Sequence, residues 1–339
     1  MKGLAKKDLL SVLEGWRGLY SVLAPLRREQ GDIVVDRLDS DRFTLEFGKP
    51  SLSPKGILLP QSEVTFNVEE GAYRETPAKG ATLLFGVRSC DAMAILQSAS
   101  FMTRDKEDIY YRSRFEDLAI VVMACEGPQN ETCFCTTAST GPWLRRGFDL
   151  QFYDLGDLFF VETGSERGAE LSSGEQFIDI TDSEILRKIE DFREKAAAAI
   201  PVVHEVKQSM TMLQDDGVGD DFWNRFGSKC IVCGGCAFVC PTCTCFNVYD
   251  QVRGEGSGQR IRTWDACLFG GFTREASGHN PRGSQALRLK RRHEHKLRYF
   301  NETDIQEALC GCVGCGRCSD YCPVHIGTLE VARAIVQSK

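Results

Sequence analysis

The fold of this chain is decided by two cysteine runs of identical spacing, CIVCGGCAFVCP at residues 230–241 and CVGCGRCSDYCP at residues 312–323. Each run reads C-x2-C-x2-C-x3-C-P, a spacing that lets three thiolates wrap one cubane iron–sulfur cluster. The proline turns the fourth cysteine away, and in two-cluster ferredoxins that cysteine ligates the other cluster. The two runs therefore predict two neighbouring [4Fe–4S] clusters.

Exchange of the fourth cysteines divides the eight thiols into two predicted ligand sets. Cluster 1 is expected to use Cys230, Cys233, Cys236 and Cys322, and cluster 2 to use Cys312, Cys315, Cys318 and Cys240. This crossed ligation holds the clusters close together, so that single electrons can pass between them. Zinc is the alternative, but zinc ribbons use paired C-x2-C knuckles about 15 to 20 residues apart, not four cysteines in one short loop.

Length and composition indicate a globular chain. With 339 residues, 42% of them hydrophobic and 26% charged, it is long enough for two or three domains of roughly 100 to 200 residues. The net charge of −7 argues against a nucleic-acid binder, which needs clustered positive charge. The longest apolar run, residues 118–125, is strand-sized, so no membrane span is expected. No secretory signal pattern is recognised, and reduced thiols are therefore expected.

The first half has the pattern of an α/β unit. Residues 81–87 and 118–124 have the composition of buried strands, residues 92–102 that of the helix between them, and residues 182–200 that of a long helix capped by Asp182 or Ser183. We expect an α/β or α+β N-terminal domain at residues 1–215. A helical, ferredoxin-like 2[4Fe–4S] dicluster domain is expected at residues 222–339, with a long insertion at residues 243–311 between its cysteine runs.

The insertion and its border carry four further cysteines, Cys243, Cys245, Cys267 and Cys310. Free cysteine is among the most buried residue types, so structural burial is the default interpretation of all four. The basic stretch RLKRRHEHKLR at residues 288–298 is expected to be a solvated helix face, with a surface for an acidic partner as the alternative. No G-x-G-x-x-G after a strand and no Walker A sequence occurs, so we recognise no nucleotide or substrate site in this chain.

Four cysteines of the first half follow the two predicted buried strands. Cys90 comes just after the first strand, Cys125 just after the second, and Cys133 and Cys135 lie in the loop that leaves it. Ligand sites in parallel sheets gather beyond the carboxyl ends of strands, so these thiols are expected near one edge. Residues alone leave two interpretations open: a third cluster, or four inert or partly exposed thiols.

The whole chain resembles the iron–sulfur subunit family that contains the A subunit of anaerobic sulfite reductase and the β subunit of soluble sulfhydrogenases. The resemblance is carried by GVRSCD at residues 86–91, Cys125, CFC at 133–135, CPTCTC at 240–245, WDAC at 264–267, GHNPR at 278–282 and VGCGRC at 313–318. Because Cys90, Cys125, Cys133 and Cys135 belong to this pattern, the resemblance favours a third Fe–S cluster.

This resemblance also implies a function. It predicts a subunit of a cytoplasmic multi-subunit oxidoreductase that relays electrons between a flavin (FAD), NAD(P)H-binding subunit and a separate catalytic subunit, sulfite reductase-like or hydrogenase-like. One alternative is a self-sufficient Fe–S enzyme whose N-terminal cluster keeps an open coordination position, as catalytic metal sites do. The other is a zinc-stabilised interaction module.

Overall fold

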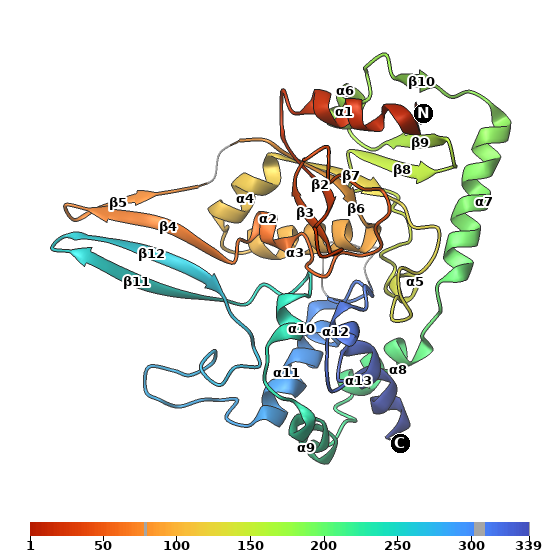
Figure 1. Ribbon diagram of the computed structural model, residues 1–339. Helices are drawn as coiled ribbons and strands as arrows, with labels where there is room; N and C mark the ends of the chain where they lie inside the picture. Colours follow the sequence, from red (N-terminus) through yellow and green to blue (C-terminus); the bar gives the residue numbers. More distant parts are fainter. Residues whose placement is uncertain (78–79, 302–308, 339) are drawn as a thin grey trace.

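The computed structural model describes residues 1–77, 80–301 and 309–338, and its largest element is a mixed sheet of eight strands in the order β10-β1-β9-β8-β7-β6-β2-β3 (Figure 1). Strands β2, β6, β7 and β8 pair in parallel and the outer strands pair antiparallel. The strands are β1 (Lys2–Ala5), β2 (Ser21–Arg27), β3 (Ile33–Arg37), β6 (Thr82–Val87), β7 (Leu118–Met123), β8 (Leu150–Asp154), β9 (Leu158–Thr163) and β10 (Phe177–Asp179).

The predicted strand–helix–strand unit is confirmed as β6, α3 (Ser89–Thr103), α4 (Ile109–Glu116) and β7. All six residues of β7 are buried, as expected for a parallel strand covered on both faces. Helix α3 begins earlier than the pattern predicts, which places Cys90 in its first turn. The long helix α7 (Ser183–Ala199) is capped by Asp182, whose carboxylate accepts a hydrogen bond from the backbone N–H of Glu184 at 2.8 Å.

The second half is helical and has its own core, built around Trp223, Leu289 and Ile335. Its helices are α8 (His204–Gln214), α9 (Asp220–Lys229), α10 (Gly235–Phe238), α11 (Gln285–Leu297), η2 (Tyr299–Asn301), α12 (Arg317–Asp320) and α13 (Thr328–Gln337). The first half also contains η1 (Lys6–Asp8), α1 (Leu9–Trp16), α2 (Lys55–Leu58), α5 (Cys135–Ala138) and α6 (Glu166–Leu171). Within the described residues, no helix has the length and apolar character needed to cross a membrane.

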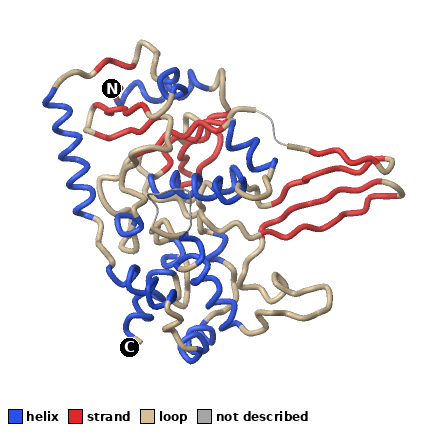
Figure 2. The backbone as a smooth tube through the Cα atoms, turned by 180° about the vertical axis from the view of Figure 1, so that it is seen from behind, coloured by secondary structure: helices blue, strands red, loops and turns tan. Residues whose placement is uncertain are grey.

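A second, four-stranded antiparallel sheet joins the two halves of the chain. Its order is β11-β12-β4-β5, with β4 (Ser62–Glu69) and β5 (Ala72–Glu75) from the first half and β11 (Phe246–Gly254) and β12 (Ser257–Trp264) from the insertion. The two hairpins project together from the body as an arm (Figures 1 and 2). The domain limits at residues 215 and 222 stay a prediction, and residues 302–308 of the insertion lie outside the described residues.

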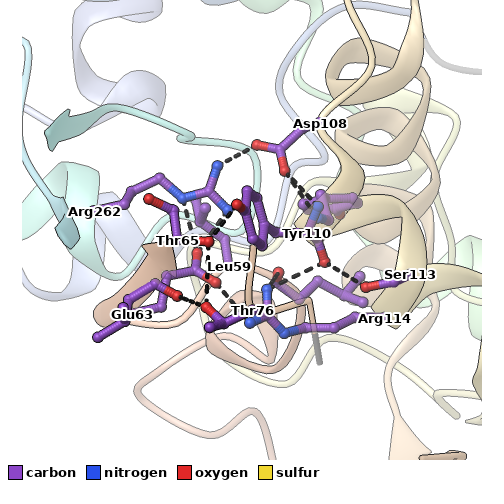
Figure 3. A network of polar contacts seen from close by, with 12 residues as sticks. Leu59, Glu63, Thr65, Thr76, Asp108, Tyr110, Ser113, Arg114 and Arg262 are labelled. Carbon is purple, nitrogen blue, oxygen red and sulfur yellow. Dashed lines mark hydrogen bonds and ion pairs between the residues drawn. The ribbon is translucent and has the colours of Figure 1, made fainter. Parts of the chain in front are cut away.

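A buried ionic network fixes the base of this arm (Figure 3). Arg262 of β12 donates from Nε and Nη2 to Glu63 Oε1 at 2.8 and 2.6 Å, and from Nη1 to Asp108 at the start of α4. Arg114 of α4 donates to the other oxygen of Glu63 at 2.6 Å. Because a buried charge that loses its partner is costly, this network keeps the insertion hairpin attached to the first half.

Candidate iron–sulfur centres

The two cysteine runs follow the same backbone path. Left-handed φ angles occur at matching positions on either side of the second cysteine, +59° and +72° at Val232 and Gly234, and +62° and +74° at Gly314 and Gly316. In each run a one-turn helix, α10 or α12, then carries the third cysteine. Loops with left-handed residues can turn successive backbone N–H groups into a concave array, which fits an anionic cluster. A valine in this region costs about 1 to 2 kcal/mol, a strain typical of functional loops.

The fourth cysteine of the second run lies beside the first run. Burial raises the pKa of Cys236 to about 11, against the opposing charge of Arg292, and the sulfurs of Cys318, Cys230 and Cys322 raise it further. Cys322 is therefore a neighbour of the first run, as the crossed ligand sets require. The assignment of cluster 1 ligands itself stays a prediction.

The fourth cysteine of the first run lies beside the second run in the same way. Burial raises the pKa of Cys315 to about 11, Arg317 and Lys49 oppose this effect, and the sulfur of Cys240 adds to it. Cys240 thus lies within electrostatic reach of the second run. The assignment of cluster 2 ligands also stays a prediction.

The two predicted ligand sets differ in exposure. Cys233 is exposed, and Cys230, Cys236 and Cys322 are half-buried. All four cysteines of the cluster 2 set are buried. A cluster held by the first set would therefore lie near the surface, and one held by the second would lie in the interior.

The four N-terminal cysteines gather around one cavity. Cys90 lies in the first turn of α3, Cys125 lies two residues beyond β7, Cys133 follows in the loop, and Cys135 begins α5. All four are buried, and all four line the same cavity. Burial raises the pKa of Cys135, and the sulfurs of Cys125 and Cys133 raise it further. The structure brings these residues together, as the third-cluster hypothesis requires.

The second cysteine run is docked directly on the N-terminal cysteine loop. The backbone N–H of Phe134 donates to the carbonyl of Gly314 at 2.9 Å, and a Cβ on Gly314 would lie 2.6 Å from the carbonyl oxygen of Phe134. Arg317 and Asp91 form a bidentate pair at 2.5 and 2.7 Å with both side chains buried. Cys315 also lines the cavity of the N-terminal cysteines. The cluster 2 thiols and the N-terminal thiols are therefore adjacent.

The four additional cysteines do not share one environment. Cys310 is fully buried, as predicted, but Cys243, Cys245 and Cys267 are only half-buried. Cys243 lies beside Cys240 of the first run, and Cys245 lies beside Cys267, whose hydrogen bond lowers the pKa of the Cys245 thiol. Burial of these three is less complete than predicted because they lie on the two segments that lead into and out of the exposed arm, Cys243 and Cys245 before β11 and Cys267 after β12.

The basic helix α11 is only partly the solvated face that the sequence predicts. Arg288, Lys290 and Arg291 keep partial exposure, whereas Arg292 and Lys296 are each 2% exposed. Burial acts to lower both pKa values, but nearby sulfurs more than compensate and raise them well above their usual range. For Arg292 the strongest of these are Cys236 and Cys318, and for Lys296 the strongest is Cys240. The helix points two cations into the cysteine region, where a negatively charged cluster would stabilise them.

The donors of this region are thiols next to buried cations. The thiols lie on the loops of the two cysteine runs and around the N-terminal cavity, and Arg292 and Lys296 are buried near them. These features fit an anionic iron–sulfur cluster with thiolate ligands.

Comparison with known proteins agrees with this chemistry. Residues 229–326 match the family of the 4Fe-4S dicluster domain. Over 312 residues the chain is 31% identical to a Pyrococcus furiosus protein named sulfhydrogenase 2 subunit beta, an alignment that covers 91% of this chain and 90% of that relative. No solved structure matches the chain.

The protein is thus an iron–sulfur electron-transfer protein of the dicluster class, and it carries two [4Fe–4S] clusters. More specifically, the chain belongs to the family of the sulfhydrogenase β subunit. The family resemblance and the predicted architecture, a mixed α/β first half followed by a helical dicluster region, are both confirmed.

Proposed function

We propose that this chain is the electron-relay subunit of a cytoplasmic multi-subunit oxidoreductase. It passes single electrons between a flavin (FAD) subunit that binds NAD(P)H and a separate catalytic subunit, which is hydrogenase-like or sulfite reductase-like. Support comes from the relative, which is named as one subunit of a sulfhydrogenase. The relay consists of cluster 1 at Cys230, Cys233, Cys236 and Cys322, cluster 2 at Cys312, Cys315, Cys318 and Cys240, and a third cluster at Cys90, Cys125, Cys133 and Cys135.

The observation that carries this proposal is the order of the three cysteine groups in space. The first group reaches the surface at Cys233, next to the exposed apolar residues Ile231 and Val232. The second group is buried, and the sulfurs of Cys318 and Cys322 lie close enough to Cys236 of the first group to raise its pKa. Cys315 of the second group borders the cavity of the N-terminal group. This series gives electrons a continuous route from one surface into the α/β domain.

The self-sufficient enzyme is the weaker alternative. A catalytic metal site keeps one coordination position free of protein ligands. The N-terminal cavity instead has four buried cysteines on its wall, enough to ligate every iron of a cubane. Complete ligation suits electron transfer better than substrate binding.

The proposal is tested on the native assembly, purified anaerobically with its subunits identified. On addition of NAD(P)H, the visible absorption of this chain's clusters should bleach in the assembly. The isolated, cluster-loaded chain should neither bleach nor turn over any substrate. Turnover of sulfite, hydrogen or NAD(P)H by the isolated chain would refute the relay role, as would a native chain that purifies without partners.

A further inference from the structure

Three buried cations surround the cysteines of the second half. Arg292 and Lys296 come from α11, and Lys55 comes from α2 in the first half. Their side chains lie in the interior, 2%, 2% and 8% exposed. In the described part of the chain none of the three pairs with a carboxylate; their partners are neutral groups. An unpaired buried cation is costly, so these charges need a resident anion.

Arg292 has N–H groups that are not used in hydrogen bonds within the described residues. Its Nη1 donates to Nε2 of His293, at 3.0 Å, and His293 Nδ1 in turn donates to the carbonyl of Leu289. Its Nε and Nη2 are buried and have no partner among the described residues. Cys236 of the first run and Cys318 of the second are the sulfurs that act most strongly on this guanidinium, so its charge lies near cysteines of both runs.

Lys296 reaches the second cluster through a threonine. Its Nζ donates to Thr242 Oγ1 at 2.8 Å, and that oxygen lies 3.4 Å from Cys240 Sγ. Lys55 approaches the same loop from the other side, where its Nζ donates to the carbonyls of Ala237 and Cys243 at 2.9 and 3.0 Å. Both ammonium groups therefore lie beside Cys240, the cysteine that the first run contributes to the second cluster.

A cubane with four thiolate ligands is an anion, and reduction adds one more negative charge to it. A fixed cation nearby stabilises the reduced form more than the oxidised form, and the effect is large in a water-poor interior. Reduction potentials of such clusters respond to net charge and to hydrogen bonds at sulfur. The fixed cations beside the ligands change the local net charge, and their free N–H groups can donate hydrogen bonds to sulfur.

We propose that Arg292 and Lys296 are resident counter-charges that raise the reduction potential of the second cluster, and that Arg292 also raises that of the first. The inference rests on the ligand sets of the proposed function. Arg292 and Lys296 would then act through the clusters, because their charges determine at which cluster of the relay the electron is most stable.

Redox titration followed by EPR spectroscopy tests this inference on the cluster-loaded chain. Lys296→Met should lower the reduction potential of one cluster by about 59 mV, which is a tenfold shift of its equilibrium toward the oxidised form for a one-electron couple. Arg292→Gln should shift both clusters in the same direction. The charge-retaining variants Lys296→Arg and Arg292→Lys should stay within about twofold of the parent protein.

The matched control is Lys290→Met on the same helix. Lys290 is half-buried and pairs with the carboxylate of Asp220 at 3.5 Å, so its charge is already balanced and its loss should leave both potentials within about twofold. Unchanged potentials in Lys296→Met and Arg292→Gln, at unchanged iron content, would overturn the inference.

Loss of iron gives a second readout if the charge-removing variants assemble poorly. Retention of clusters by the charge-retaining variants alone would then support the counter-charge role, and loss in those variants too would refute it. If the parent chain binds fewer than about eight irons, the ligand sets fail first and the inference fails with them. A parent chain that binds its clusters but lacks partners refutes only the relay proposal.

Discussion

The Asp91–Arg317 pair should hold the second cysteine run against the α/β domain, and Asp91→Ala tests this directly. Arg317 is fully buried, Asp91 is 3% exposed at its side chain, and two hydrogen bonds of 2.5 and 2.7 Å join them. Removal of the carboxylate leaves a buried guanidinium whose remaining partner is the carbonyl of Pro50 at 2.9 Å. A broken buried pair costs about 3 to 5 kcal/mol. At about 2 °C per kcal/mol, Tm should fall by about 6 to 10 °C.

Anaerobic calorimetry measures this change, and Asp250→Ala provides the matched control. Asp250 also forms a bidentate pair, with Arg260 at 2.7 and 2.8 Å, but both side chains are largely exposed. Its loss should change Tm far less, because exposed ion pairs contribute little. Adding Arg317→Met to Asp91→Ala should recover part of the stability, since no unpaired charge is left. Equal Tm changes in the two single variants would refute the reasoning.

The remaining predictions concern iron content, loop strain and acid stability. Replacing Cys90 and Cys125 by Ser should remove about four irons per chain, measured by iron and sulfide assay, because both line the N-terminal cavity. Val232→Gly should stabilise the first run by about 1 kcal/mol, because it removes the strain of a valine at a left-handed φ of +59°. Gly314→Val should destabilise the second run, because the added Cβ would meet the carbonyl of Phe134. Denaturant titration measures both changes. Burial, and after it the charge of Arg292, lowers the pKa of His293 to about 3, below the 6.5 of an unfolded histidine. The contribution of neutral His293 to the free energy of unfolding is therefore complete above pH 6.5 and should fall by about 1 kcal/mol between pH 6.5 and 5.5. Comparison of the parent chain with His293→Gln over this pH range measures the change.

Each of these predictions has a control. Cys310→Ser should keep the full iron content, because Cys310 lies outside the three predicted ligand sets; equal iron loss there would remove the support for a third cluster. Ala at Val232 keeps the left-handed strain and should not reproduce the gain of Gly. If His293→Gln and the parent chain lose stability in parallel below pH 6.5, His293 is not the group that titrates.

The cysteine spacing predicts the second half well because each run is a local signal. Three ligands lie within seven residues, and the backbone that connects them has little freedom. The strand–helix–strand unit is predicted for a similar reason, since the apolar run Leu118–Met123 is buried on both faces. The start of α3 is missed because Ser89 and Asp91 are polar in sequence but buried in the fold.

Long-range partners account for what the sequence does not reveal. The hairpin of β11 and β12 pairs with β4 nearly 200 residues earlier, and no local pattern specifies that register. The charges of 288–298 look solvated because a charge run usually is, and only the neighbouring sulfurs explain the burial of Arg292 and Lys296. One sequence feature does point to the shared orientation of Arg292 and Lys296. They are four residues apart, so their side chains lie on the same face of a helix.

Metal analysis of the anaerobically purified chain tests the central claim most directly. Three clusters predict about twelve irons and about twelve acid-labile sulfides per chain, of which the two C-terminal runs account for about eight of each. A brown chain with this content would agree with the account. A colourless chain that contains zinc, or one with fewer than about eight irons after complete reconstitution, would contradict it.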